Sequence, residues 1–152
     1  MMDDATLLAN ALKFKEEGNE AFKIKSYNVA MGAYAKGIDH CERIKEESAE
    51  SKNLLKTLLV NNSVCSNATN GFQDSVRNLG RAIEIDSSNA KAFFLRSTAY
   101  YNLKSYDEAL SDIKQAVKLA PNDAKLRQEF ERIKNVRAEH MKAEQNKYAS
   151  FF

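Results

Sequence analysis

The stretch LKSYDEAL at residues 103–110 repeats the pattern of IKSYNVAM at residues 24–31. Both run apolar, Lys, Ser, Tyr, two variable residues, Ala and apolar. A weaker third copy, NGFQDSV, occupies residues 70–76. The aromatic anchors of the three copies are Tyr27, Phe72 and Tyr106. Because these anchors are 45 and 34 residues apart, the sequence predicts a stack of similar supersecondary units.

Each anchor is followed by residues at helical spacing. A small residue comes three positions later, a large one after seven and another small one after ten. These residues are Ala30, Tyr34 and Gly37 in the first copy, Ser75, Leu79 and Ala82 in the second, and Ala109, Ile113 and Ala116 in the third. Such offsets place side chains on one helix face, where small residues let a neighbouring helix approach. With another helical segment upstream of each anchor, every unit is predicted to be a helix–turn–helix of about 34 residues.

The composition favours an all-α fold without catalytic machinery. The 152 residues include 5 Gly and 1 Pro, fewer than β-sandwiches, doubly wound α/β domains or disordered linkers need. The net charge of +2 gives no global field that would attract nucleic acid. Two Cys without metal spacing predict reduced thiols, and no apolar run is long enough to span a membrane. No nucleophile elbow, phosphate loop or metal motif is present, so we expect no enzyme activity, metal or cofactor.

The helix pairs resemble the tetratricopeptide repeat, a unit of about 34 residues with small residues, an aromatic anchor and a closing Pro. The matching residues are Gly18, Asn19, Phe22, Tyr27 and Ala30 in the first copy, and Ala99, Tyr100, Tyr106, Ala109, Ala116 and Pro121 in the third. The second copy is degenerate, with Ser63 and Ser75 where smaller apolar residues are usual. The resemblance implies a single-domain α-solenoid capped by a long C-terminal helix. The implied segments are the domain 1–152, repeats near 11–44, 56–89 and 90–123, and the helix 124–152.

Local chemistry predicts several helix boundaries. Ser105 and Glu108 have the spacing of a capping box, the stretch Ser87, Ser88 and Asn89 offers N-caps for the helix that carries Lys91, and the stretch Pro121, Asn122 and Asp123 is expected to stop one helix and cap the next. The 11 additional residues between the first two anchors fall around residues 41–52, which contain no Gly or Pro, so we expect longer helices around a short corner. Residues expected mostly in the repeat core include Phe22, Phe93, Phe94, Tyr100, Tyr101 and Cys65.

Four polar residues indicate what the solenoid binds. Stacked helix pairs leave a concave groove lined by their first helices, and Lys15 and Asn19, four residues apart, share one face. Together with Asn61 and Lys91 they resemble the carboxylate clamp of co-chaperone tetratricopeptide domains. The resemblance implies a groove that binds the Glu-Glu-Val-Asp tail of heat shock protein 90, or of cytosolic heat shock protein 70.

Leu95 departs from that clamp, which normally has an Arg four positions after the Lys of the third repeat. Arg96 is adjacent, but at about 100° per residue it lies about 140° from Lys91 around the helix, against about 40° for Leu95. We therefore expect Arg96 to face a neighbouring helix or solvent. The missing contact is expected to weaken tail binding by about one to two decades. Phe94 and Thr98 are expected to line the groove beside Leu95.

Alternatives stay open for the site and for the function. Asn62 rivals Asn61 as the inward amide, and Lys15 and Lys91 are otherwise solvated surface residues. The second hypothesis is a scaffold for a non-chaperone protein, in which Leu95 suits a ligand with fewer carboxylates.

The full length also resembles the C-terminal half of large immunophilins of the cyclophilin and FK506-binding types. The supporting stretches are KAFFLR at residues 91–96 and KYASFF at residues 147–152. The resemblance implies a cytoplasmic protein, with the nucleus as a further location. It leaves two alternatives open, an excised domain of a longer protein with an N-terminal isomerase domain and a stand-alone adaptor. From Ala124 onward the chain has seven basic and four acidic residues, so calmodulin binding is weighed against a merely solvated helix. Exposed Tyr148, Phe151 and Phe152 are where self-association is expected, if it occurs.

Overall fold

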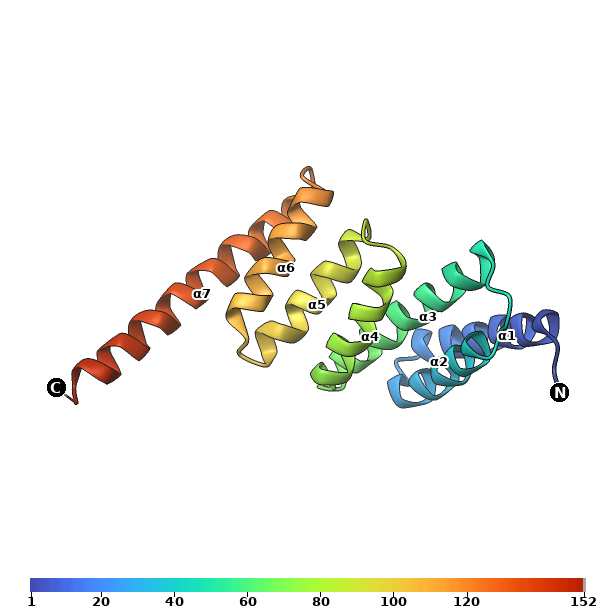
Figure 1. Cartoon of the computed structure of the whole chain (residues 1–152). Coiled ribbons are helices and arrows are strands. Elements are labelled where there is room, and N and C mark those ends of the chain that lie inside the picture. Colours follow the sequence, from blue (N-terminus) through green and yellow to red (C-terminus); the bar gives the residue numbers. More distant parts are fainter. Residues whose placement is uncertain (152) are drawn as a thin grey trace. The chain divides into compact units, whose positions relative to one another are not determined.

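The computed structural model describes residues 1–151, and these form seven α-helices and no strand (Figure 1). The all-α prediction is therefore confirmed for the described chain. The helices are α1 (Asp4–Lys23), α2 (Tyr27–Glu42), α3 (Ala49–Ala68), α4 (Phe72–Ile85), α5 (Ala90–Asn102), α6 (Tyr106–Leu119) and α7 (Ala124–Ala149). None of the described helices is long and apolar enough to cross a membrane.

The chain divides into two compact units, Met1–Ser88 and Asn89 onward. The first unit contains two helical hairpins, α1–α2 and α3–α4, with α2 packed against α3. The second contains the hairpin α5–α6, with α7 packed against α6. Each hairpin corresponds to one copy of the sequence pattern, with the aromatic anchor as the first residue of its second helix.

The three hairpins share one turn. The residues Lys25, Asn70 and Lys104 each have a φ between 60° and 63°, in the left-handed region. In each turn the next N–H donates to a carbonyl five residues back, at 2.7–2.9 Å, as in a Schellman motif. This repeated turn reverses the chain within a few residues, so that the two helices of a hairpin pack side by side.

The corner between α2 and α3 is short and tied down, as the sequence predicted. Arg43 caps α2 and Ser48 caps α3, so only a few residues separate the two helices. The Asp4 carboxylate accepts the backbone N–H groups of Lys45 and Glu46, each at 3.0 Å. These hydrogen bonds lower the pKa of Asp4 and attach the corner to the start of α1.

The predicted helix starts are confirmed, with Asn89, Ser105 and Asp123 as the N-cap residues, but the capping box predicted at Ser105 does not form. The Asn89 side chain accepts from Ala92 N at 3.2 Å, and Asp123 accepts from Lys125 N at 3.0 Å. Ser105 makes no side-chain cap hydrogen bond. Its own N–H already donates to the Tyr100 carbonyl at 2.9 Å in the hairpin turn, so it is not available to a capping box.

The predicted core is mostly confirmed, with Phe22 as the exception. Cys65 is fully buried and Phe93 is 9% exposed, while Phe94, Tyr100 and Tyr101 are half-buried. Phe22 is 39% exposed and contacts Tyr27 edge-to-face across the hairpin turn, with ring centroids 5.9 Å apart. It lies at the end of α1, where the turn opens to solvent, rather than in the core.

Two glycines allow the helices of the first unit to approach closely. A Cβ on Gly18 would lie 2.4 Å from Cε1 of Tyr34, and one on Gly37 would lie 3.0 Å from Cδ1 of Leu58. Tyr34 and Leu58 are both almost completely buried. The packing of α2 against its neighbours therefore depends on the absence of side chains at these two positions.

The substitution Gly18→Ala is expected to lower the free energy of unfolding by about 2–3 kcal/mol, because the Tyr34 ring must move to admit the methyl group. The matched control is Gly32→Ala, since a Cβ there would meet nothing within 4 Å. That change should raise stability by about 0.5–1 kcal/mol through helix propensity. Urea denaturation followed by circular dichroism measures both, and equal effects would contradict the close-packing argument.

Candidate peptide-binding site

The predicted site residues lie on the first helix of each hairpin. Lys15 and Asn19 lie on α1 and Asn61 on α3, within the first unit. The other four lie on α5 in the second unit, and they are Lys91, Phe94, Leu95 and Thr98.

Asn19 is held by a hydrogen bond that the sequence analysis missed. The Tyr34 hydroxyl, on α2, donates to Oδ1 of Asn19 at 2.6 Å. Tyr34 is 1% exposed, and burial raises the pKa of Tyr34 to about 12, so this hydroxyl keeps its proton at neutral pH. With the amide oxygen occupied, the Asn19 NH₂ group is left to donate to a ligand. Gly18 makes room for the ring that carries the hydroxyl.

A signal for Tyr34 was present in the sequence. The second and third copies have Leu79 and Ile113 at the equivalent core position, whereas the first copy has Tyr. A hydroxyl in a buried position needs a partner. That requirement points across the hairpin to a polar residue on α1, which is Asn19.

Lys15 and Asn61 complete the set in the first unit. Lys15 is half-buried one turn before Asn19, and no ion pair occupies its ammonium group within the described chain. Asn61 and Asn62 are both half-buried on α3. Burial is alike at these two positions, so Asn62 stays the alternative to Asn61.

On α5 the predicted residues span the first two turns. Lys91 is exposed and follows the Asn89 cap, while Phe94, Leu95 and Thr98 are half-buried. The Thr98 hydroxyl donates to the Phe94 carbonyl at 3.2 Å. Lys125, at the start of α7, lies with Nζ 5.3 Å from the centre of the Phe94 ring. The second unit thus presents an exposed ammonium group beside partly apolar surface.

Arg96 faces the neighbouring helix, as predicted. Its Nε and an Nη atom donate to the two carboxylate oxygens of Asp112, on α6, at 2.7 and 2.8 Å. Asp112 is 5% exposed, and this ion pair raises the pKa of Arg96. The guanidinium also lies 5.7 Å from the centre of the Phe93 ring. Arg96 is therefore paired inside the hairpin, and it does not replace the clamp Arg whose position is occupied by Leu95.

Comparisons with known proteins agree with this arrangement. Residues 90–123 match the tetratricopeptide repeat family. The C-terminal TPR-containing domain of a putative FK506-binding protein from Plasmodium falciparum, PFL2275c, superposes with a TM-score of 0.86 at 25% identity, covering 93% of this chain and 97% of that one. Residues 90–123 carry a tetratricopeptide repeat (TPR), and the chain has the fold of a TPR domain.

Two further similarities are to TPR domains of other proteins. The first TPR of Spaghetti (RPAP3), solved with the HSP90 peptide SRMEEVD, has a TM-score of 0.74 at 27% identity, covering 86% of this chain and 95% of that one. Human protein unc-45 homolog B is 28% identical over 123 residues, or 81% of this chain. The chain spans only 12% of the length of that relative.

The last helix of the TPR domain has a covered and an exposed part. Leu126 and Ile133 are at most 5% exposed against the hairpin, whereas Tyr148 and Phe151 are 62% and 73% exposed. This division agrees with the expectation of a cap whose end projects. Phe152 lies outside the described residues. The calmodulin prediction rests on this helix and on the immunophilin resemblance, and no matched protein described above supports it.

Removing the partner of Arg96 should destabilise the TPR domain. Asp112→Ala is expected to lower the free energy of unfolding by about 2–3 kcal/mol, because a largely buried guanidinium loses both its charge partner and two hydrogen bonds. Asp74→Ala is the control, since it breaks the exposed pair with Arg77 and should change stability by less than about 0.5 kcal/mol. Thermal and urea unfolding report both changes. A neutral Asp112→Ala would show that the pair does not hold α5 to α6.

Proposed function

We propose that this TPR domain is a co-chaperone adaptor that binds the acidic C-terminal tail of heat shock protein 90, with the tail of heat shock protein 70 as a related ligand. The observation that carries the proposal is the Asn19 carboxamide, whose oxygen is held by Tyr34 and whose NH₂ is left to donate. Lys15 lies one turn away on the same helix face. An ammonium group and an oriented amide donor suit a ligand carboxylate.

The proposed contacts from the two units are of one kind. Each proposed contact residue has a side chain with N–H donors and without a carboxylate that would repel the ligand. These residues are Lys15, Asn19 and Asn61 in the first unit and Lys91 in the second. A charge-assisted hydrogen bond to a carboxylate contributes about 1.5–3 kcal/mol. The TPR domain of Spaghetti, which resembles this chain at 27% identity, was solved with an HSP90 peptide ending in EEVD.

Leu95 sets the expected strength of this interaction. The clamp that the sequence resembles has an Arg at this position, and Arg96 does not take its place because its Nε and one Nη atom are paired with Asp112 of α6, which turns the guanidinium toward that helix. We therefore propose that the tail is bound more weakly than by a complete clamp. The apolar Leu95 also supports a second candidate function, which is binding of a non-chaperone peptide with fewer carboxylates.

The parent protein and its location belong to the same proposal. The similarity to the TPR-containing domain of a putative FK506-binding protein supports an immunophilin-type parent with an isomerase domain elsewhere. We propose a cytoplasmic site of action, with the nucleus as a further location, because that is where the proposed chaperone ligands are available.

Calorimetric titration with a Met-Glu-Glu-Val-Asp peptide tests the tail site. Lys91→Ala should weaken binding about tenfold through loss of one charged contact, and Leu95→Arg should tighten it by about 10–100-fold by restoring one. Lys142→Ala, at an exposed position of α7, is the matched control and should leave the affinity unchanged. Absence of heat at millimolar peptide would overturn the proposal. Tighter binding of a tail with fewer carboxylates would favour the second candidate.

The substitution Tyr34→Phe tests whether the hydroxyl orients Asn19. We expect peptide affinity to fall about three- to tenfold, because the amide is then free to rotate, while stability falls by only about 1 kcal/mol. Tyr27→Phe, on the same helix, is the control and should leave peptide affinity unaltered. An unchanged affinity for Tyr34→Phe would show that the hydroxyl has no positioning role.

A further inference from the structure

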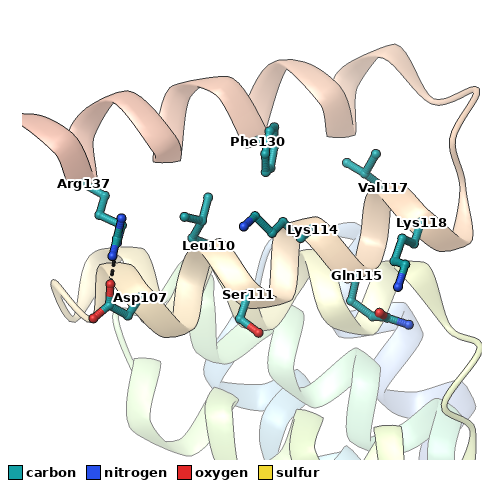
Figure 2. Close-up of a pocket in the computed structure, with 9 residues that line it drawn as sticks. All are labelled: Asp107, Leu110, Ser111, Lys114, Gln115, Val117, Lys118, Phe130 and Arg137. Carbon is teal, nitrogen blue, oxygen red and sulfur yellow. Dashed lines mark hydrogen bonds and ion pairs between the residues drawn. The ribbon is translucent and has the colours of Figure 1, made fainter.

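A groove runs between α6 and α7 in the second unit, and none of the residues predicted to bind the chaperone tail lines it. Its volume is about 750 Å³. The lining residues come from α6 and α7 alone (Figure 2). Grooves of this size are typical of sites for small ligands and for short stretches of peptide.

The groove has an apolar floor. Figure 2 shows Phe130 pointing from α7 toward α6, while Leu110 and Val117 point from α6 toward α7. All three side chains are half-buried. On α7, Leu126 and Ile133, which flank Phe130 in the sequence, are at most 5% exposed. An apolar side chain of a ligand would therefore complete the burial of these three residues, with a favourable transfer of apolar surface from water.

The rim of the groove is positively charged. Lys114 extends into the gap beneath Phe130, and Lys118, one turn later, lies at the rim (Figure 2). Both are exposed, and no ion pair is recorded for either within the described chain. Lys134 lies one turn after Phe130, so helical spacing places it on the same face of α7.

Among the residues that line the groove, the acidic one is already paired. Asp107 accepts from Nε of Arg137 at 2.5 Å across one end of the groove (Figure 2). Asp112, in the middle of α6, is buried and paired with Arg96 of α5. The lysines of the rim are therefore left with a net positive charge and an apolar floor between them.

We propose that this groove is a second docking site, which takes an acidic peptide segment of a partner protein with an apolar anchor residue. The anchor lies among Leu110, Val117 and Phe130, and flanking carboxylates meet Lys114 and Lys118. Charge complementarity selects an acidic ligand. The apolar floor is recessed, so the side chain of a peptide can reach it. A membrane surface instead takes up apolar residues that project from a protein, so the recess favours a peptide ligand. The site is independent of the tail site, because it needs no terminal carboxylate.

The probe is a fluorescein-labelled, C-terminally amidated peptide in which Phe and Leu, three residues apart, are flanked on each side by three Glu or Asp. The amide removes the terminal carboxylate that the proposed tail site would bind. Fluorescence anisotropy at about 50 mM salt measures its affinity for the whole chain. We expect saturable binding, a loss of about tenfold or more for the Lys114→Glu/Lys118→Glu pair, and a similar loss when the Phe and Leu of the peptide become Ala.

The matched control is Lys142→Glu/Lys147→Glu, which changes the net charge equally at exposed positions of α7 far along the helix from Phe130. It should change affinity by less than about twofold. Lys91→Ala should also leave binding of this probe intact, so the tail-site proposal and this one can fail separately. Amide chemical-shift changes clustered at Leu110, Val117 and Phe130 would support the location without reliance on a variant.

Several results would overturn the proposal. These are the absence of saturable binding at millimolar peptide, an equal loss in the two charge-reversed pairs, and retention of affinity by the Ala-substituted peptide. Binding to vesicles of phosphatidylserine and phosphatidylcholine that depends on Lys114 and Lys118, without peptide binding, would instead assign the surface to membranes.

Discussion

The contact between Tyr34 and α1 is the constraint on which the first unit depends. The ring occupies space that only a glycine at position 18 leaves open, and the hydroxyl reaches one residue further to the Asn19 amide. The same side chain therefore fixes the separation of two helices and the orientation of a surface donor. Stability and recognition are linked here by one residue, so a change that relaxes the packing also releases the amide.

In the second unit, helix packing and ligand recognition depend on different residues. Arg96 is held between α5 and α6 by Asp112, and its charge is used inside the hairpin. Lys91, Lys114 and Lys118 are exposed and carry their charge toward solvent. A guanidinium suits the first role because its planar fork matches a carboxylate with two hydrogen bonds, whereas an ammonium group is a compact charge on a flexible stem. Arg96 therefore has a partner inside the unit, whereas the three lysines are left for partners outside it.

The sequence could predict features that depend on local spacing. The helix pairs, the caps at Asn89 and Asp123, the short corner near Asp4 and the direction of Arg96 all follow from helical periodicity or from nearby polar groups. The capping box at Ser105 was predicted wrongly because the N–H of Ser105 is used by the preceding turn, which the capping pattern does not encode. Phe22 was predicted wrongly because an aromatic residue at a helix end can lie on the turn instead of in the core. Asp112 and the groove beside Phe130 required the pairing of helices to be known.

The shared left-handed turn has a consequence for how the chain folds. Because each hairpin closes through Lys25, Asn70 or Lys104 and pairs helices that are adjacent in sequence, most packing in a hairpin joins residues a few tens of positions apart. When contacting residues are close in sequence, only a short loop must close before the contact forms. The entropy cost of loop closure is therefore small, and such chains fold quickly. In repeat architectures, stability is the sum of units and of the interfaces between neighbours. A hairpin of this chain is therefore stabilised from outside mainly by its interface with the neighbouring hairpin or helix, and it can form or open separately. Amide hydrogen exchange would then show the hairpins opening one at a time.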